Sequence, residues 1–377
     1  MKIAFIGQKG VPATFGGVEY HVDELGRHLA ALGHEVTIYV RSWYTPRRLK
    51  THNGMRLVHL PTIRTKHLDA AVHSFTAAVH AAFNNFDIVH FHALGPSFFS
   101  FIPAMAGKTV VVTVHRLDWA TRKWGPLARR LLKIAERVVV HVPRKTIVVS
   151  RDLQTYFRNK YRRETAHVSH GITLPQRESP NIIRQKYHLR GGDFILFMGR
   201  LTPEKRVDWL LEAYRRAVAD RPASDRPRLV IAGGSSATDA HVRSLQEQAD
   251  KIPGVVFTGY VRGKEKDELL SNAALFVLPS SLEGFPIVLI EARSHGLCCL
   301  ASDIPPHREA IRDGEDGRLF HSGDLGDLSD KLADLLDKPE TRKAMGAAAL
   351  KALSVRPGWE DVARKTLSVY QAALPRA

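Results

Sequence analysis

The sequence predicts an α/β protein made of two doubly wound domains. Short apolar runs that suit buried parallel strands alternate with helical patterns, and loops rich in glycine or charge lie between them. With 377 residues, of which 44% are hydrophobic, the chain is long enough for two packed domains. Residues 170–180 are rich in glycine, proline and serine, and we expect them to form the linker.

The first domain opens with a strand, a glycine-bearing loop, a helix and a second strand. Residues 3–6 and 35–40 are the apolar runs, and a helical pattern over residues 20–32 lies between them, preceded by Gly16 and Gly17. A glycine pair before a helix lets backbone N–H groups approach a phosphate, and the helix dipole adds attraction. The spacing is neither GxGxxG nor a P-loop, so the glycines could also serve only to shape the turn.

Two further strands are expected at residues 87–92 and 109–115, after a helix near residues 68–83. The second strand ends at His115, and the carboxyl edge of a parallel sheet is where α/β folds bind ligands. His115 could therefore contact a sugar hydroxyl. Because the chain has 19 histidines, an ordinary buried and hydrogen-bonded histidine is the alternative.

Residues 126–137 have the pattern of a basic amphipathic helix, which can lie on an anionic membrane or pack as an ordinary surface helix. A strand at residues 146–150 and a basic helix at residues 151–161 follow. The expected apolar side of the first helix comprises Leu127, Leu131, Leu132 and residues 134–135, with Arg129, Arg130, Lys133 and Arg137 elsewhere.

The net charge of +17 is concentrated in the first half of the chain. Residues 1–170 contain 25 lysines and arginines against 10 acidic residues, a net charge of +15, whereas the remainder has 30 against 28. Such a field favours an anionic partner: a membrane surface, a lipid phosphate or nucleic acid. No zinc finger, helix-turn-helix or aromatic RNA-binding motif occurs, which disfavours nucleic acid. A generally basic proteome would also explain the charge.

The second domain repeats the alternation of strands and helices. Arg200 and Lys205 lie between an apolar run at residues 194–198 and a helical pattern at residues 207–219. Two cations in a loop at the end of a strand suit a diphosphate, although solvated loop charges are also common. Further strands are expected at residues 228–234, 255–260, 273–278 and 298–302, and late helices at residues 325–336, 338–352 and 359–373.

Glu283 and Glu291 follow the apolar run at residues 273–278, the first in a loop and the second in a helix. Gly284, Phe285 and Pro286 form the bend between them. Two acceptors at the carboxyl edge of a sheet suit a ligand rich in hydroxyl groups, with a sugar at one and a ribose at the other. The alternative is a pair of solvated acids, which are favoured near the start of a helix.

Two adjacent cysteines, Cys298 and Cys299, form neither a disulfide framework nor a metal-ligand spacing, which fits a reducing compartment. The N-terminal apolar run is too short for a signal peptide, and no run reaches the length of a membrane span. We therefore expect a cytoplasmic protein.

Over nearly its whole length the chain resembles the family-4 retaining glycosyltransferases of GT-B fold. The motifs that carry the resemblance are Gly16-Gly17, Gly199-Arg200 with Lys205, Phe257-Thr258-Gly259, Glu283-x7-Glu291 and Ser302-Asp303. The segments GQKGVPATFGGVEYHVDEL and HRLDW are similar to a subgroup that assembles bacterial cell-surface polysaccharides and includes rhamnosyltransferases. The resemblance implies two Rossmann-like domains that face each other across a cleft. The first, residues 1–170, would be the acceptor-side domain, and the second, residues 171–355, would bind the nucleotide-sugar. Residues 356–377 would form a helix that packs back toward the first.

The resemblance also implies a role for each matching position. The catalytic residues would be His115, which lies beside the sugar, Glu283, which binds it, and Arg200 and Lys205, which hold the diphosphate. The donor-binding residues would be Gly16, Gly17, Arg200, Lys205, Val261, Arg262, Glu283, Gly284, Phe285, Pro286 and Glu291. In this set Val261 and Arg262 would contact the base, and Glu291 would bind the ribose. Asp118 and Trp119 would lie on the acceptor side.

The implied reaction moves a hexose or deoxyhexose from a nucleotide-sugar to a glycan or lipid-linked acceptor, with retention of anomeric configuration. The departing phosphate would help to deprotonate the acceptor. The chain has no DxD motif, so we expect no metal and no cofactor, since the nucleotide-sugar is a co-substrate. The expected location is the cytoplasm, at the inner face of the cytoplasmic membrane through the basic first half, and nucleic acid is not an expected partner. Ser169-His170-Gly171 stands where many relatives have Pro-Asn-Gly, so we expect the hinge side of the cleft, and with it acceptor choice, to differ from theirs.

Two other functions compete with this one. A nicotinamide-dependent dehydrogenase or epimerase would need an acidic residue about 20 positions after the glycine loop, where residues 40–42 read VRS. A non-catalytic basic protein that binds membranes or nucleic acid would explain the charge but not two α/β units with their loop motifs.

Overall fold

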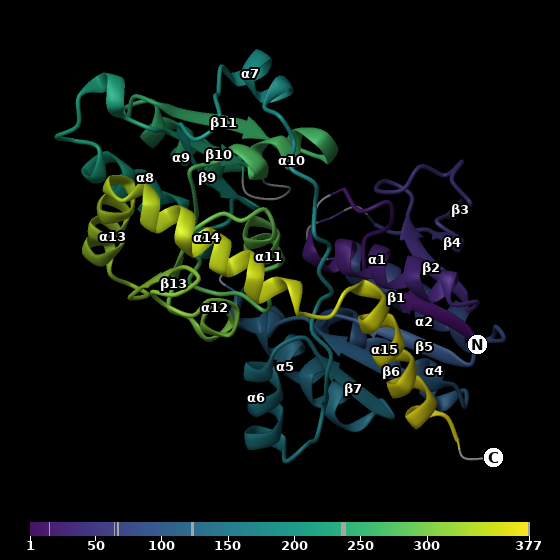
Figure 1. The fold of residues 1–377 in the computed structure, drawn as a ribbon. Coiled ribbons are helices and arrows are strands. Elements are labelled where there is room, and N and C mark those ends of the chain that lie inside the picture. The colour runs from purple at the N-terminus through teal and green to yellow at the C-terminus, as the bar shows by residue number, and fades with distance from the viewer. Residues whose placement is uncertain (15, 64, 66–67, 122–123, 235–238, 376–377) are drawn as a thin grey trace. The chain divides into compact units, whose positions relative to one another are not determined.

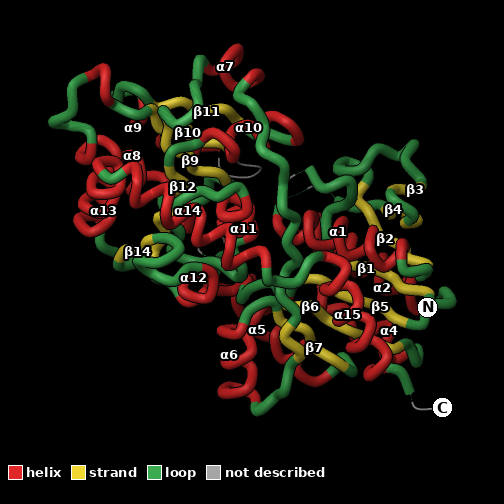
Figure 2. The backbone as a smooth tube through the Cα atoms, in the orientation of Figure 1, coloured by secondary structure: helices red, strands yellow, loops and turns green. Residues whose placement is uncertain are grey.

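A computed structural model describes residues 1–14, 16–63, 65, 68–121, 124–234 and 239–375. The chain forms two compact units, each built on its own parallel sheet with helices packed over it (Figures 1 and 2). Unit 1 comprises Met1–Gly171 and Pro357–Ala377, and unit 2 comprises Ile172–Arg356. These boundaries lie one residue from those that the sequence predicts.

The sheet of unit 1 has eight strands in the order β3-β4-β2-β1-β5-β6-β7-β8. All neighbours are parallel except β3 and β4, which form an antiparallel pair at one edge. The order reverses its direction between β1 and β5, so the loops that follow these two strands flank the switch point of the sheet. The elements of unit 1 are β1 (Lys2–Ile6), α1 (Gly17–Ala31), β2 (Glu35–Arg41), β3 (Thr51–His52), β4 (Met55–Leu60), α2 (Leu68–Ala82), β5 (Ile88–His92), α3 (Leu94–Ser97), η1 (Phe98–Ser100), α4 (Phe101–Met105), β6 (Thr109–Val114), η2 (Asp118–Ala120), α5 (Pro126–His141), β7 (Lys145–Val148), α6 (Arg151–Tyr161), β8 (Ala166–His167) and α15 (Trp359–Ala373).

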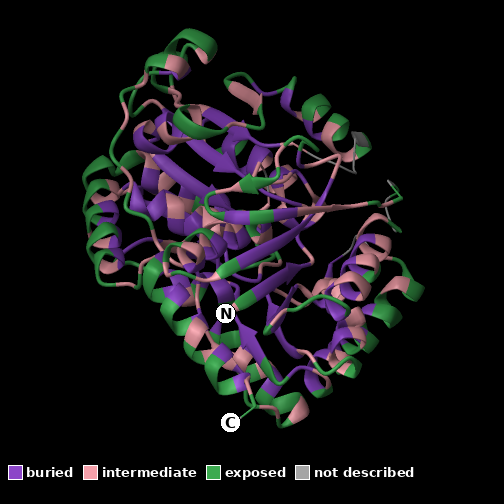
Figure 3. Cartoon of the chain, turned by 90° about the vertical axis from the view of Figure 1, so that its right-hand side faces the viewer, coloured by how far each residue is buried: buried purple, intermediate pink, exposed green. Residues whose placement is uncertain are grey.

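Continuous apolar runs explain the central strands. β6 reads TVVVTV, and β5 reads IVHFH, which departs from an apolar run at His90 and His92; every residue of both strands is buried. Strands covered on both faces by helices are expected to be β-branched and apolar throughout rather than alternating. Figure 3 shows this burial along the strands of both sheets.

The C-terminal helix α15 belongs to unit 1, although unit 2 precedes it in the chain. Its buried residues recur at helical spacing and include Trp359, Val362, Ala363 and Tyr370, which join the hydrophobic core of the first sheet. The hydroxyl group of Tyr370 lies 2.7 Å from Nδ1 of His90 on β5. The helix therefore closes unit 1 beside α1 (Figure 1).

The sheet of unit 2 has six strands, all parallel, in the order β11-β10-β9-β12-β13-β14. Numbered within the unit this is 3-2-1-4-5-6, the doubly wound order, and the switch point lies between β9 and β12. The elements of unit 2 are α7 (Asn181–Tyr187), β9 (Phe194–Met198), η3 (Pro203–Lys205), α8 (Val207–Ala217), η4 (Ala223–Asp225), β10 (Arg228–Ala232), α9 (Asp239–Ala249), β11 (Val255–Gly259), α10 (Gly263–Asn272), β12 (Leu275–Leu278), α11 (Ile287–Ser294), β13 (Cys299–Ser302), α12 (Pro305–Ala310), β14 (Arg318–Phe320), α13 (Leu325–Asp337) and α14 (Pro339–Ser354).

The predicted elements are present with small shifts at their ends. The helix expected at residues 20–32 is α1, which begins three residues earlier, directly after Gly16. The β3–β4 pair, the short helix α7 and the edge strand β14 were not predicted. β3, β14 and α7 have only two, three and seven residues and leave little periodicity, whereas β4 has six residues and was missed. Among the described residues, no helix is long and apolar enough to cross a membrane.

Candidate functional site

In unit 2, three of the predicted site residues come from the two loops that flank the switch point. The loop after β9 carries Arg200 and Lys205, and the loop after β12 carries Glu283. Ser281 joins the loops, because its backbone N–H and its hydroxyl group both donate to the carbonyl oxygen of Glu204, at 2.8 and 3.2 Å. The two loops therefore form one connected edge.

Lys205 and Glu283 form an ion pair across this edge. Nζ of Lys205 lies 2.5 Å from Oε1 of Glu283, and the two side chains are only 13% and 11% exposed. Burial raises the pKa of Glu283, but the charge of Lys205 and the hydrogen bonds that the carboxylate accepts outweigh this, so its pKa lies below the ordinary value. Glu283 is thus an ionised acceptor at neutral pH.

His307 on α12 is a neighbour of Glu283 that the sequence analysis did not identify. Its Nδ1 lies 2.8 Å from the carbonyl oxygen of Ser302 and therefore carries the proton that it donates. Its Nε2 is buried and has no hydrogen-bond partner among the described residues. Burial lowers the pKa of His307 to about 4, although the charge of Glu283 acts in the opposite direction, so the imidazole is neutral.

Arg200 lies beside the glycines that end the neighbouring strands. Gly233 follows β10 with φ +150°, and a Cβ atom there would lie 1.8 Å from the carbonyl oxygen of Gly199. Only glycine allows this approach. The hydroxyl group of Tyr260 donates to the carbonyl oxygen of Gly234 at 2.8 Å, and the charge of Arg200 acts on Tyr260. The ends of β9, β10 and β11 are therefore tied together around Arg200.

Glu291 lies on α11, as predicted, and its Oε1 is 2.9 Å from Nζ of Lys266 on α10. The two side chains are 23% and 28% exposed, so the carboxylate keeps an accessible part. Val261 and Arg262 lie between β11 and α10, where Arg262 is exposed and directly precedes the helix. They occupy the same edge as Arg200, two strands further along the sheet.

The bend of Gly284, Phe285 and Pro286 leads into α11, and all three residues are buried. Within the described residues, the backbone N–H of Gly284 makes no hydrogen bond. It remains a donor next to the carboxylate of Glu283.

In unit 1, Gly16 and Gly17 stand at the start of α1, as predicted. Gly16 has φ +103°, and a Cβ atom there would lie 2.1 Å from Oε2 of Glu19. Glu19 is buried in the first turn of the helix, and its Oε1 accepts from the backbone N–H of Lys9 at 3.2 Å. A phosphate at this helix start would therefore meet a carboxylate as well as the N–H groups, which weakens the attraction of the helix dipole.

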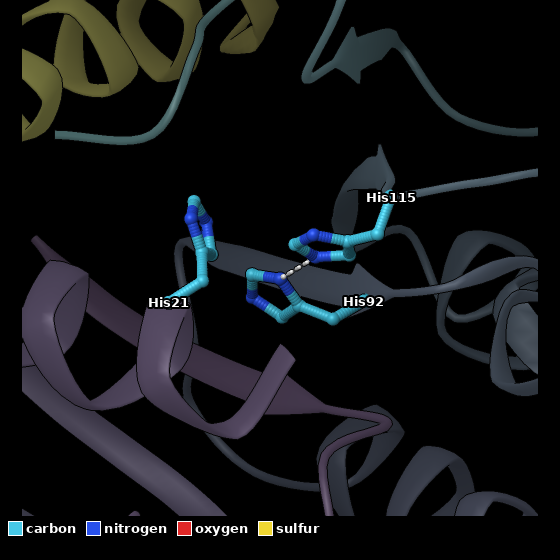
Figure 4. A group of neighbouring side chains, drawn as sticks. All are labelled: His21, His92 and His115. Carbon is cyan, nitrogen blue, oxygen red and sulfur yellow. Dashed lines mark hydrogen bonds between the residues drawn. The ribbon is translucent and has the colours of Figure 1, made fainter. Parts of the chain in front are cut away.

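His115 lies in a cluster of buried histidines at the switch point of the first sheet (Figure 4). Nε2 of His115 is 3.3 Å from Nδ1 of His92, the last residue of β5. His21 on α1 packs edge-on against His115, with ring centroids 4.9 Å apart, and its Nδ1 is 2.8 Å from Nδ1 of His170. Burial lowers the pKa of His21 to about 3 and that of His92, His115 and His170 well below the ordinary value. All four imidazoles are neutral at neutral pH.

Asp118 and Trp119 follow His115 in the short helix η2. Asp118 pairs with Nε of Arg116 at 3.0 Å. The indole N–H of Trp119 donates to the carboxylate of Glu136, which lies fully buried on α5. The same carboxylate also accepts hydrogen bonds from the side chains of Tyr156, Lys160 and Tyr161. The polar end of the indole is thus used by the fold.

The apolar side expected for the helix at residues 126–137 is wrong in part. Leu132 and Ala135 are buried, but Leu127, Leu131 and Ile134 are 71%, 51% and 44% exposed. The two groups lie on adjacent faces about 100° apart, as the 3.6-residue period requires for neighbours in sequence. Only one face packs on unit 1, and the other carries exposed leucines among arginines.

Sequence reasoning named His115, noted His170 only as part of a departure from the Pro-Asn-Gly of relatives, and missed His21, His92 and His307. The pattern HFH at the end of β5 was a signal for His92, because a strand that is buried on both faces has few reasons to carry histidines. His21 and His170 left no comparable signal, since they come from a helix and a loop that only the fold brings together.

Two family models match the chain and meet near the boundary between the units. The model described as Glycosyltransferase Family 4 matches residues 15–174, and the model described as Glycosyl transferases group 1 matches residues 179–352. Each match lies largely within one unit.

Known proteins of similar length share the whole fold. A D-inositol 3-phosphate glycosyltransferase from Thermobispora bispora is 27% identical over 395 aligned residues, which cover 96% of this chain and 91% of the relative. The crystal structure of Anabaena Alr3699/HepE with UDP and glucose superposes with a TM-score of 0.80 at 17% identity, covering 99% and 100% of the two chains. WaaG, described as a glycosyltransferase of lipopolysaccharide biosynthesis, gives a TM-score of 0.76 at 20% identity, covering 98% and 99%. The fold is GT-B, as predicted.

Proposed function

Because the chain belongs to the GT-B glycosyltransferases that these two models describe, we propose that it transfers a sugar from a nucleoside diphosphate donor held at the switch-point edge of unit 2. The observation that carries the proposal is the ion pair of Lys205 and Glu283 across that edge. It places a cation suited to phosphate next to an ionised acceptor suited to sugar hydroxyls.

Lys205 and Arg200 supply the positive charge for the diphosphate. An ammonium group has three donors, and Glu283 uses only part of them, so phosphate oxygens can bind Lys205 without breaking the pair. Arg200 adds a planar fork of donors at the ends of the neighbouring strands. Fixed cations beside the leaving diphosphate stabilise the charge that develops on it during transfer.

Glu283 and Glu291 divide the hydroxyl groups of the donor between them in this proposal. Glu283 accepts from the transferred sugar, and the N–H of Gly284 donates beside it. Glu291, whose carboxylate is oriented by Lys266, accepts from the ribose. Val261 and Arg262, in the loop after β11, contact the base.

His115 offers a neutral imidazole that can hydrogen-bond a sugar hydroxyl without adding charge. Gly16 and Gly17 approach the diphosphate through N–H groups, and Asp118 and Trp119 belong to the acceptor side. The two cations support a metal-independent reaction. In this proposal the departing diphosphate takes the proton of the acceptor hydroxyl. The leaving phosphate and the incoming hydroxyl then lie on the same face of the sugar, which supports retention of configuration.

The donor is a nucleotide-sugar, and UDP in the HepE crystal structure supports this class. The acceptor is a glycan or a lipid-linked glycan of the cell envelope, and the transferred group is a hexose or deoxyhexose such as rhamnose. The lipopolysaccharide role described for WaaG supports an envelope acceptor. The basic first half and the exposed leucines of α5 support contact with the inner face of the cytoplasmic membrane.

The test is release of nucleoside diphosphate from a panel of nucleotide-sugars, with and without a lipid-linked glycan extract. We expect Glu283→Ala to reduce release by at least about 100-fold while nucleoside diphosphate still binds. Glu247→Ala, which removes an exposed carboxylate from α9, is the matched control. If Glu283→Ala keeps full release with every active donor, the proposed role of the ion pair is wrong.

A further inference from the structure

The histidine cluster of unit 1 has an arrangement that hydrogen bonding within a core does not require. His90 shows how a core histidine is usually satisfied: its Nδ1 lies 2.7 Å from the hydroxyl group of Tyr370, and its Nε2 lies 2.7 Å from that of Thr113. His21, His92 and His115 instead face one another (Figure 4). In the described part of the chain, Nε2 of His21 and Nε2 of His92 are buried without a hydrogen-bond partner.

We propose that His21, His92 and His115 form a binding site for a late first-row transition-metal ion such as Zn²⁺. Each residue offers one ring nitrogen, and these three atoms lie within 4.8 Å of one another. Unlike the donor site of unit 2, the group contains no carboxylate. Imidazole nitrogens suit zinc, copper, nickel and cobalt, whereas magnesium and calcium prefer oxygen ligands.

One edge of a tetrahedral site is already formed. With Zn–N bonds of about 2.0 Å, two ligand nitrogens of a tetrahedral site lie about 3.3 Å apart. Nδ1 of His92 and Nε2 of His115 are separated by 3.3 Å. An ion between them replaces the single proton that this contact now holds, and a ring nitrogen of His21 supplies the third ligand.

His170 acts as the outer partner of the site. Metal-bound histidines usually donate their second ring N–H to a neighbouring acceptor, which fixes the ring and its tautomer. Nδ1 of His21 lies 2.8 Å from Nδ1 of His170. When His21 donates there, the lone pair of its buried Nε2 is available to the ion.

The charge around the cluster is compatible with a bound cation. The cationic neighbours acting on His115 include Arg116, whose guanidinium is paired with Asp118 at 3.0 Å. This pairing reduces the repulsion of an incoming cation.

A bound ion has a consequence that rests on the proposed function. His115 is the residue that we place beside the sugar, and an ion that takes its nitrogen removes it from that role. Zn²⁺ is therefore an inhibitor of the transfer reaction rather than a participant in it.

Equilibrium dialysis of the full-length protein, freed of metals with a chelator, tests the site. We expect one Zn²⁺ per chain in the wild type and no saturable Mg²⁺ binding. His92→Gln and His115→Gln should each lower the affinity by at least about tenfold, the loss that removing even an outer-shell partner of a metal site typically causes. His28→Gln, which replaces another histidine of α1 whose Nδ1 already contacts the carbonyl oxygen of Glu24, should bind as the wild type does.

Two further readouts keep the inference testable. Circular dichroism shows whether each variant is folded, and Co²⁺ gives the visible absorption bands of a tetrahedral nitrogen site only if the ligands converge. The inference is overturned if the wild type binds no stoichiometric Zn²⁺, or if both variants bind as tightly as His28→Gln. Loss of nucleoside diphosphate release on adding Zn²⁺, reversed by chelator, reports the inhibition. A protein that binds Zn²⁺ but has no release activity in its absence would contradict the proposed function and leave the metal site standing.

Discussion

At the scale of single residues, Lys205 and Glu283 set the electrostatics of the edge in unit 2. Neither side chain is more than 13% exposed. Little water reaches either charged group, so each charge is stabilised mainly by the other. Glu283 remains ionised because Lys205 outweighs the effect of its burial on the pKa. Removal of either partner would therefore leave a poorly solvated charge at the edge of the sheet.

This dependence predicts how stability changes with pH. The folded-state pKa of Glu283 lies below its unfolded value, so its contribution is full above the unfolded pKa and is lost as pH falls through the folded pKa. Lys205→Met should lower the free energy of unfolding by about 1–3 kcal/mol at pH 7, and the deficit should shrink as pH falls from 7 through the folded-state pKa of Glu283 and the carboxylate protonates. Thermal unfolding across this range measures it.

Lys251→Met serves as the control, because Lys251 is exposed after α9. A deficit for Lys205→Met that stays constant with pH would show that the loss comes from packing and not from the charge of Glu283.

The candidate residues differ in how far sequence could reveal them. Lys205, Glu283 and Glu291 lie in loops and helix starts next to strong apolar strands, so their place at the sheet edge follows from local pattern. The partnership of His307 with Glu283 could not be predicted, because it depends on the approach of α12 to a loop 24 positions earlier in the chain. The contact between Glu19 and Gly16 likewise appears only once α1 is built.

At the scale of elements, Glu136 joins three parts of unit 1. Its carboxylate receives the indole N–H of Trp119 from η2 and the side chains of Tyr156, Lys160 and Tyr161 from α6. Burial raises the pKa of Glu136, but these hydrogen bonds outweigh burial and hold its pKa below the ordinary value. One carboxylate thus fixes the loop that carries Asp118 and Trp119.

Replacing that acceptor should loosen the whole connection. Glu136→Gln places an amide N–H₂ group next to side chains that themselves donate hydrogen bonds, and Lys160 loses its negatively charged partner. We therefore expect the free energy of unfolding to fall by about 3 kcal/mol. Urea unfolding followed by near-ultraviolet circular dichroism measures it. Glu35→Gln, at the exposed start of β2, should change stability by less than about 0.5 kcal/mol. Equal effects of the two variants would refute the role of Glu136.

The strands were easier to predict than their order. Runs such as FILFM and TVVVTV identify buried parallel strands, and the alternation with helices predicts doubly wound sheets. The position of α15 in unit 1 is consistent with its amphipathic pattern, but that pattern does not state which sheet it covers. The exposed face of α5 was mispredicted because its apolar residues occupy two adjacent faces, and only packing decides which is buried.

At the scale of the whole molecule, the positive charge is distributed unevenly along the chain. Unit 1 carries most of the excess of +17, and α5 adds exposed apolar side chains at positions 127, 131 and 134. Basic charge attracts an anionic surface, and apolar side chains at helical spacing can enter its interface.

We therefore predict that the protein sediments with anionic phospholipid vesicles at low salt, and that binding weakens as salt rises. The double variant Leu131→Ser with Ile134→Ser should bind at least about tenfold more weakly, because it loses two apolar side chains that would be buried in the membrane interface. Leu350→Ser, at an exposed position of α14 in unit 2, should bind as the wild type does. Failure of the wild type to sediment would exclude the membrane contact.

The account depends most on a diphosphate bound beside Lys205 and Arg200, and calorimetric titration with UDP, GDP, ADP and dTDP and their nucleosides tests this directly. We predict that at least one diphosphate binds the wild type, and that Lys205→Ala weakens it at least about tenfold, the loss of one charge-assisted hydrogen bond. Binding of the matching nucleoside should change little, and Lys251→Ala should change neither. If no nucleoside diphosphate binds more tightly than its nucleoside, or if Lys205→Ala weakens both equally, the proposed site is contradicted.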